Sequence, residues 1–167
     1  MRKELVRAVR KQFALRLRAT IPDFREIDCG PLSSHFSLYE WKAGEALTFF
    51  VALQHHRNED SFTIEIGWSR NGRWPTNSLP ASAPDDYSED GEMHFRLGKL
   101  WAGNKDVWWE FTARVSALQA TFDDFMKEPE PIGSLLPKVE PLVEDAIQHL
   151  VSDGLKYFGR VASAMAR

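Results

Sequence analysis

The strongest constraint on the fold is a run of alternating apolar and polar residues between positions 35 and 69. Large apolar side chains occupy every second position of three stretches, as expected for strands with one buried face. These positions are Phe36 and Leu38, then Leu47, Phe49, Val51 and Leu53, then Phe62, Ile64, Ile66 and Trp68. The connections at 42–45 and 57–60 are short and polar, and the first contains Gly44. The three stretches are therefore predicted to form an antiparallel meander.

One register of the second and third strands places every large apolar group on the same side of the sheet. The predicted apolar pairs are Phe49 with Trp68, Val51 with Ile66, and Leu53 with Ile64. The same register brings Phe50 opposite Gly67 on the other side. A shift by one residue would reverse the direction of all these side chains.

Helical spacing of apolar residues marks both ends of the chain. The first helix is predicted from about Lys3 to Thr20, and Pro22 ends it. A long C-terminal helix is predicted to begin near Pro141, because proline is favoured in the first turn of a helix. Its apolar stripe consists of Val143, Ile147, Leu150, Gly154, Phe158, Val161 and Met165.

The region between the meander and the C-terminal helix has mixed signals. Residues 75–92 contain three prolines and five acidic residues and are predicted to form a long surface loop. Strand patterns return at 93–97 and, less clearly, at 107–111. Residues 113–126 could extend a strand or form a helix, and the spacing of their apolar residues favours a helix. Together these patterns predict a single α+β domain over residues 1–167. Its antiparallel four- to five-stranded meander sheet would carry the N-terminal helix and one or two C-terminal helices on one face.

Composition restricts the environment and the chemistry. Cys29 is the only cysteine, which excludes an internal disulfide and any site that needs several thiolates. A reducing compartment is the natural interpretation, and no apolar run approaches the roughly 20 residues that cross a bilayer. We therefore expect a cytoplasmic protein. The sequence also lacks the motifs GxxxxGK[ST], GxGxxG, HExxH, GxSxG and CxxC.

The side of the meander opposite the apolar stripe, here called the second face, is predicted to carry aromatic rings among hydrogen-bonding groups. Its predicted members are Ser37, Tyr39, Trp41, Thr48, Phe50, Gln54, His56, Thr63, Glu65 and Ser69. Such a surface suits recognition of a ligand or a protein, because polar groups set orientation while rings supply buried area. If residues 113–126 or the first helix covered this face, the rings would instead be ordinary core. The candidate binding residues are Tyr39, Trp41, Phe50, Gln54, His56, Arg70, Arg73 and Trp74.

The segment 55–60 (HHRNED) is the densest group of titratable residues and supports an alternative function. His56 with Glu59, Asp60 and Glu65 could form the site of a small-molecule or metal-dependent hydrolase. The competing interpretation is a polar hairpin loop in which Asp60 caps backbone amides. No cofactor or metal is required by either motif or composition.

The first helix concentrates positive charge. Residues 1–18 contain seven basic side chains and one acidic side chain, whereas the whole chain has a net charge of −3. Such a helix could contact phosphates. A solvated face is favoured, because the isoelectric point is near 6.0 and no aromatic residue interrupts the basic stripe. We do not expect nucleic-acid binding.

From about Leu5 to Ser69, under half of the chain, the sequence resembles small uncharacterised bacterial proteins that form a domain of unknown function. The similar segments are FSLY at 36–39, FFVALQ at 49–54 and FTIEIG at 62–67. The resemblance implies an N-terminal helix followed by an aromatic-rich meander, and it carries over no functional residue. The expected function is that of a non-catalytic binding or accessory module with a protein partner. The oligomeric state is left open, with a homodimer as one option.

Overall fold

The alternating central stretch forms the antiparallel sheet, in a computed structural model that describes residues 3–28, 36–76, 91–103, 105–111 and 132–166. Six strands are present in this part of the chain, in the order β1-β2-β3-β4-β5, and β6 pairs with the beginning of β4. Their bounds are β1 (Arg25–Ile27), β2 (Phe36–Lys42), β3 (Thr48–His55), β4 (Ser61–Ser69), β5 (Glu92–Arg96) and β6 (Trp109–Glu110). The predicted meander is confirmed. β1 was not predicted, and β6 is shorter than the expected strand at 107–111.

The predicted register of β3 and β4 is confirmed at every pair. Val51 lies opposite Ile66, and Phe50 lies opposite Gly67. Gly67 is required by a close approach, since a Cβ atom there would lie 2.9 Å from the backbone oxygen of Met93 and 3.2 Å from Pro75. The glycine therefore allows residue 75 to pack directly on the sheet.

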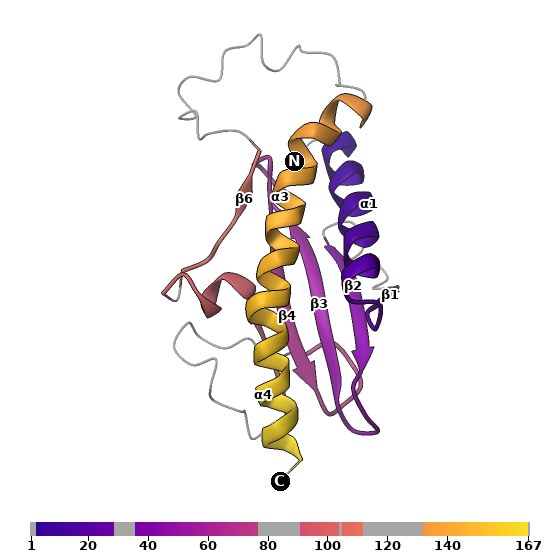
Figure 1. The fold of residues 1–167 in the computed structure, drawn as a ribbon, viewed down its shortest axis with the longest axis vertical. Coiled ribbons are helices and arrows are strands. Elements are labelled where there is room, and N and C mark those ends of the chain that lie inside the picture. Colours follow the sequence, from indigo (N-terminus) through magenta and orange to yellow (C-terminus); the bar gives the residue numbers. More distant parts are fainter. Residues whose placement is uncertain (1–2, 29–35, 77–90, 104, 112–131, 167) are drawn as a thin grey trace.

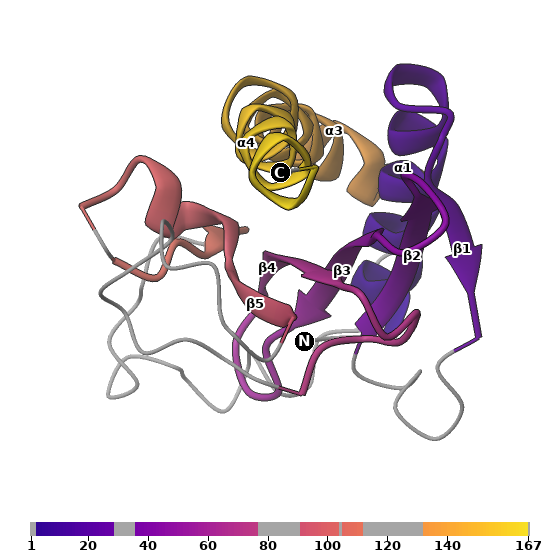
Figure 2. The ribbon, with the colours of Figure 1, turned by 90° about the horizontal axis from the view of Figure 1, so that it is seen from below.

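Helices cover one face of the sheet and complete the α+β architecture (Figures 1 and 2). α1 (Lys3–Thr20) has the predicted bounds, and it lies beside α3 (Ile132–His149). A π-helical turn (Leu150–Gly154) joins α3 to α4 (Leu155–Met165), so these elements form one continuous rod. No helix in the described ranges is long and apolar enough to span a membrane.

The start predicted for the C-terminal helix is wrong. The helix begins at Ile132, and both Pro137 and Pro141 lie inside α3. Both prolines are exposed, so the carbonyl groups that lose a backbone donor can bond to water. Leu135 and Val139 are buried in the main core and hold this segment in place. Tertiary packing thus overrides the local signal of proline.

The main core lies between the helices and the face of the sheet that carries Phe49, Val51 and Leu53, here called the core face. The predicted stripe of the C-terminal helix faces it, with Met165 partly buried and the other members buried. Phe49 stacks on Phe158 of α4 with ring centroids 4.4 Å apart. This layer accounts for most of the buried apolar side chains in the described part of the chain.

The second face also carries apolar packing, which corrects the expectation that only one side of the sheet would do so. Leu38, Phe50 and Ala52 form a separate buried cluster, and Trp74 packs against it. Phe50 is fully buried, so its ring is part of a small core. The central strands are therefore packed on both faces.

The predicted phase of β2 is also wrong. Tyr39 pairs with Val51 and Trp41 pairs with Phe49, so both side chains lie on the core face. The alternation could not decide this point, because β2 carries large apolar side chains in both phases. The hairpin decides it, since the backbone N–H of Ala43 donates to the carbonyl of Leu47 at 3.0 Å.

Two predictions fall outside the described residues. These are the helix at 113–126 and most of the surface loop at 75–92, of which residues 77–90 are not described. The strand at 93–97 is confirmed as β5, displaced by one residue.

Candidate functional site

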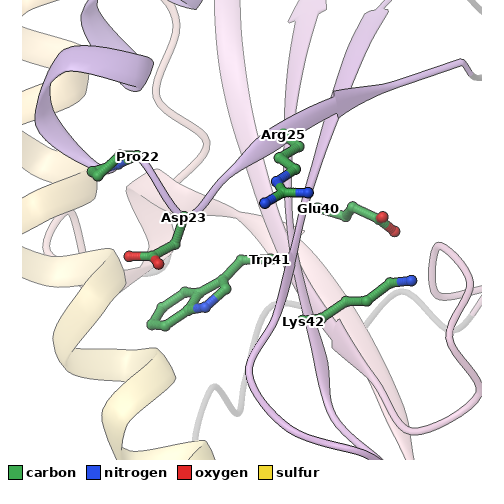
Figure 3. A pocket seen from close by; sticks show the side chains of 6 residues that line it. All are labelled: Pro22, Asp23, Arg25, Glu40, Trp41 and Lys42. Carbon is green, nitrogen blue, oxygen red and sulfur yellow. The ribbon is translucent and has the colours of Figure 1, made fainter.

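A groove opens at the edge of the sheet where α1 leads into β1 (Figure 3). It encloses about 330 Å³. Six residues line it: Pro22, Asp23, Arg25, Glu40, Trp41 and Lys42. We call it the edge groove. Of the predicted binding residues, Trp41 is the one that lines it. This volume matches the lower end of the range for small-molecule sites.

The sheet and the turn after α1 together position the indole of Trp41. Its ring lies 5.8 Å from that of Phe24 in an edge-to-face arrangement and 5.4 Å from that of Phe49. It remains partly exposed. Because neighbouring core rings fix its orientation, the indole offers a rigid apolar surface at the groove.

Charged residues of both signs line the groove, but of these only Asp23 lies beside the indole. Arg25 and Glu40 are register partners across β1 and β2. Figure 3 shows the carboxylate of Asp23 beside the indole of Trp41, with Arg25, Glu40 and Lys42 on the opposite side. A segment that crosses this edge of the sheet could therefore contact the indole on one side and charges of both signs on the other.

A second group of polar side chains lies on the second face, at β4 and β5. The carboxylate of Glu65 lies 3.5 Å from His94 Nδ1 and 3.9 Å from Arg96 Nε. Arg96 also pairs with Asp106, and its guanidinium lies 4.9 Å above the ring of Trp108. The prediction placed Glu65 on this face correctly. It missed His94 and Arg96, although their alternation with Met93 and Phe95 indicated the same side.

In the hairpin at 55–60, the side chain of His56 stabilises the turn. His56 Nδ1 accepts hydrogen bonds from the backbone N–H groups of Asn58 and Glu59, at 3.3 and 3.0 Å. This nitrogen therefore stabilises the turn, a role that the sequence assigned to Asp60. Glu65 pairs with His94 rather than with the hairpin. In the described ranges, no cluster of three or more His, Cys, Asp or Glu residues could hold a metal ion.

The other predicted binding residues have separate places. Gln54 is half-buried on the second face, and its Oε1 accepts no hydrogen bond from the described groups. Trp74 contacts Phe50 and His94, with centroid distances of 5.9 and 5.1 Å. Arg70 is exposed. Tyr39 is buried against Phe13, and burial raises the pKa of its hydroxyl.

Arg73 and its neighbours surround a buried carboxylate that sequence reasoning missed. Glu92 accepts hydrogen bonds from Thr76 Oγ1 at 2.7 Å, Thr76 N at 3.1 Å and Asn71 Nδ2 at 3.0 Å. The Arg73 guanidinium lies 3.3 Å from the Glu92 carboxylate, and the Arg73 side chain is 55% exposed. The hydrogen bonds from Thr76 and Asn71 lower the pKa of Glu92 to about 2. This carboxylate anchors residues 70–76, and with them Trp74, to the sheet.

Glu92→Gln is expected to lower the free energy of unfolding by about 2 kcal/mol at neutral pH. The side-chain NH2 of the glutamine would face Thr76 and Asn71, whose groups are themselves hydrogen-bond donors. The contribution of Glu92 is fully present above its ordinary pKa of 4.5 and is lost as the pH falls toward 2. Urea unfolding at pH 7 and pH 3 should thus show a smaller gap between variant and wild type at pH 3. The control is Glu45→Gln, in the exposed hairpin loop. An equal effect of both substitutions would contradict the anchoring role.

A further cluster lies at the π-helical turn and was not predicted. The ring of His149 stacks on Trp101 at 3.9 Å, and its Nδ1 lies 3.1 Å from Asp153 Oδ2. Burial opposes ionisation of Asp153, but hydrogen bonds with His149 and Ser152 hold the pKa of its carboxyl below the ordinary value. The i, i+4 spacing of His149 and Asp153 was the available signal. The cluster joins the segment after β5 to the C-terminal rod.

The edge groove is therefore the described site that combines an accessible ring, opposite charges and open volume. No protein-family model, curated protein or solved structure matches this chain.

Proposed function

We propose that the protein is a non-catalytic binding module that engages a protein partner through the edge groove. The observation that carries the proposal is the partly exposed Trp41, which lies in a groove of about 330 Å³ that two acidic and two basic residues also line. Tryptophan at such a position is typical of the residues that dominate binding energy.

The groove is suited to an extended peptide segment. β1 lies at the end of the strand order, and β2 is its only neighbour among the described strands. An edge strand offers backbone donors and acceptors to an added strand, while a nearby pocket selects a side chain. The charges of Asp23, Arg25, Glu40 and Lys42 would orient the peptide. The single cysteine, Cys29, supports a reducing, cytoplasmic setting for this interaction.

Trp41→Ala is expected to weaken binding of a peptide at least about 30-fold, as for an interface anchor. The probe is a peptide selected on the wild-type protein from a displayed random library and then measured by calorimetry. Trp41 also contacts Phe24 and Phe49, so some loss of stability is expected, and binding is compared at a temperature where both proteins are folded.

Trp108→Ala is the matched control, since Trp108 is also partly buried but lies beside His56 and Arg96, outside the groove. It should leave peptide affinity within about twofold, which is under 0.5 kcal/mol. Glu40→Gln should weaken binding without affecting the core. Equal losses in the two tryptophan variants, or selection of no peptide by the wild type, would overturn the proposed function.

A further inference from the structure

Four cations align on the outer side of α1. Lys3, Arg7, Lys11 and Arg18 are all exposed. At about 100° per residue they fall within about 80° of one another on the helix surface. We call these four residues the basic stripe. Figure 1 shows that α1 lies beside α3 at the margin of the molecule.

The basic stripe differs from the other cations of α1 in its contacts. Arg16 pairs with Glu144 of α3 at 3.5 Å, and Arg10 Nε donates to His55 Nε2 at 3.3 Å. In the described part of the chain, no ion pair involves a member of the basic stripe. Like charges spaced three and four residues apart destabilise a helix. The stripe therefore has a small cost for folding and an unused capacity to bind anions.

One apolar side chain accompanies these charges. Leu15 is 60% exposed, the larger of two exposed fractions among big apolar residues in the described ranges. It lies four residues after Lys11 and three before Arg18, and so borders the stripe. The helix buries Leu5, Val9, Phe13 and Leu17 in the main core, and Val6 is half-buried.

We propose that the basic stripe and Leu15 form a docking surface for an acidic, amphipathic segment of a partner protein. Four cations complement carboxylates on such a segment, and Leu15 supplies an apolar contact at the border of the stripe. This surface is independent of the edge groove. A partner segment that places acidic residues on either side of one apolar residue would match it.

The composition of the surface favours a protein over other anionic partners. A phosphate backbone gains nothing from an exposed leucine. A lipid surface requires an exposed apolar helix face, whereas the apolar face of α1 is buried. An acidic, amphipathic protein segment can use both the cations of the stripe and the exposed side chain of Leu15.

The test uses a fluorescent helical peptide with glutamates along one face and a leucine among them, measured by anisotropy against the full chain. Arg7→Gln with Lys11→Gln is expected to weaken binding about tenfold, through two exposed charge pairs. The matched control neutralises Lys105 and Lys156, which are exposed on other elements. Leu15→Ala should weaken binding about threefold, and all variants should keep the wild-type melting temperature within a few degrees.

Three outcomes would overturn the proposal. The first is no binding of the acidic peptide by the wild-type chain. The second is an equal loss in the Arg7/Lys11 variant and the Lys105/Lys156 variant, which would show attraction by net charge alone. The third is tighter binding to duplex DNA or to phosphatidylserine vesicles than to the peptide. Trp41→Ala should not alter this affinity, so the docking surface and the edge groove can fail separately.

Discussion

Trp68→Ala is expected to lower the free energy of unfolding by about 4 kcal/mol, a large share of the stability of an ordinary domain. Trp68 is completely buried near the end of β4. Its Nε1 donates to the hydroxyl of Tyr157 at 3.0 Å, and this hydroxyl lies 3.4 Å from Met93 Sδ. The substitution removes an indole from the main core and leaves Tyr157 without its donor. Urea unfolding followed by tryptophan fluorescence and circular dichroism would measure the loss.

Milder substitutions separate the ring from its hydrogen bond. Tyr157→Phe leaves the indole N–H without an acceptor and should cost about 1–2 kcal/mol. Combined with Trp68→Phe, it should cost less than the sum of the two single changes. Additive effects would show that the hydrogen bond contributes nothing, and a change below about 1 kcal/mol for Trp68→Ala would contradict the core position.

Acidification from pH 7 to pH 4 is expected to remove about 3 kcal/mol of stability through His55 alone. Burial, and secondly the Arg10 guanidinium, lower the pKa of His55 from 6.5 to about 3. In the unfolded chain His55 therefore binds a proton below pH 6.5, whereas in the folded chain it binds one only near pH 3. The contribution of neutral His55 to stability is fully present above pH 6.5 and decreases as the pH falls from 6.5 toward 3.

His55→Gln should abolish this component, because glutamine can accept from Arg10 but does not titrate. The difference in unfolding free energy between wild type and variant, measured in urea at pH 7 and pH 4, isolates it from the carboxylates. Arg10→Met should reduce the size of this component. Removing the guanidinium takes away one cause of the lowered pKa, so the pKa of His55 in the folded chain should rise toward 6.5. Identical pH profiles for wild type and His55→Gln would contradict the buried neutral histidine.

The sequence predicted local structure wherever one pattern had a single solution. The register of β3 and β4 followed from alternation, because only one pairing buries Phe49, Val51 and Leu53 together. The bounds of α1 followed from its apolar spacing. The face of each β2 side chain could not be predicted in this way, because Leu38 and Tyr39 are both large and mainly apolar, and either could face the core.

The candidate site was predictable only in part. Trp41 was identified as a binding residue, but on the wrong face and with neighbours that lie elsewhere. Asp23 and Arg25 carry no local signal, because they belong to a turn and a three-residue strand that pairing with β2 creates. Glu92 likewise shows its role only when Asn71 and Thr76 meet it in space.

By itself the sequence determined the α+β class, the meander, its central register and the concentration of positive charge on α1. Periodicity encodes these features, because each depends on spacing within a single segment or between two adjacent ones. The tertiary structure alone decided that both faces of the sheet are packed, that α3 continues through Pro137 and Pro141, and that Trp41 opens into a groove. These outcomes depend on contacts between distant segments, whose combined packing outweighs the local preference of any single residue.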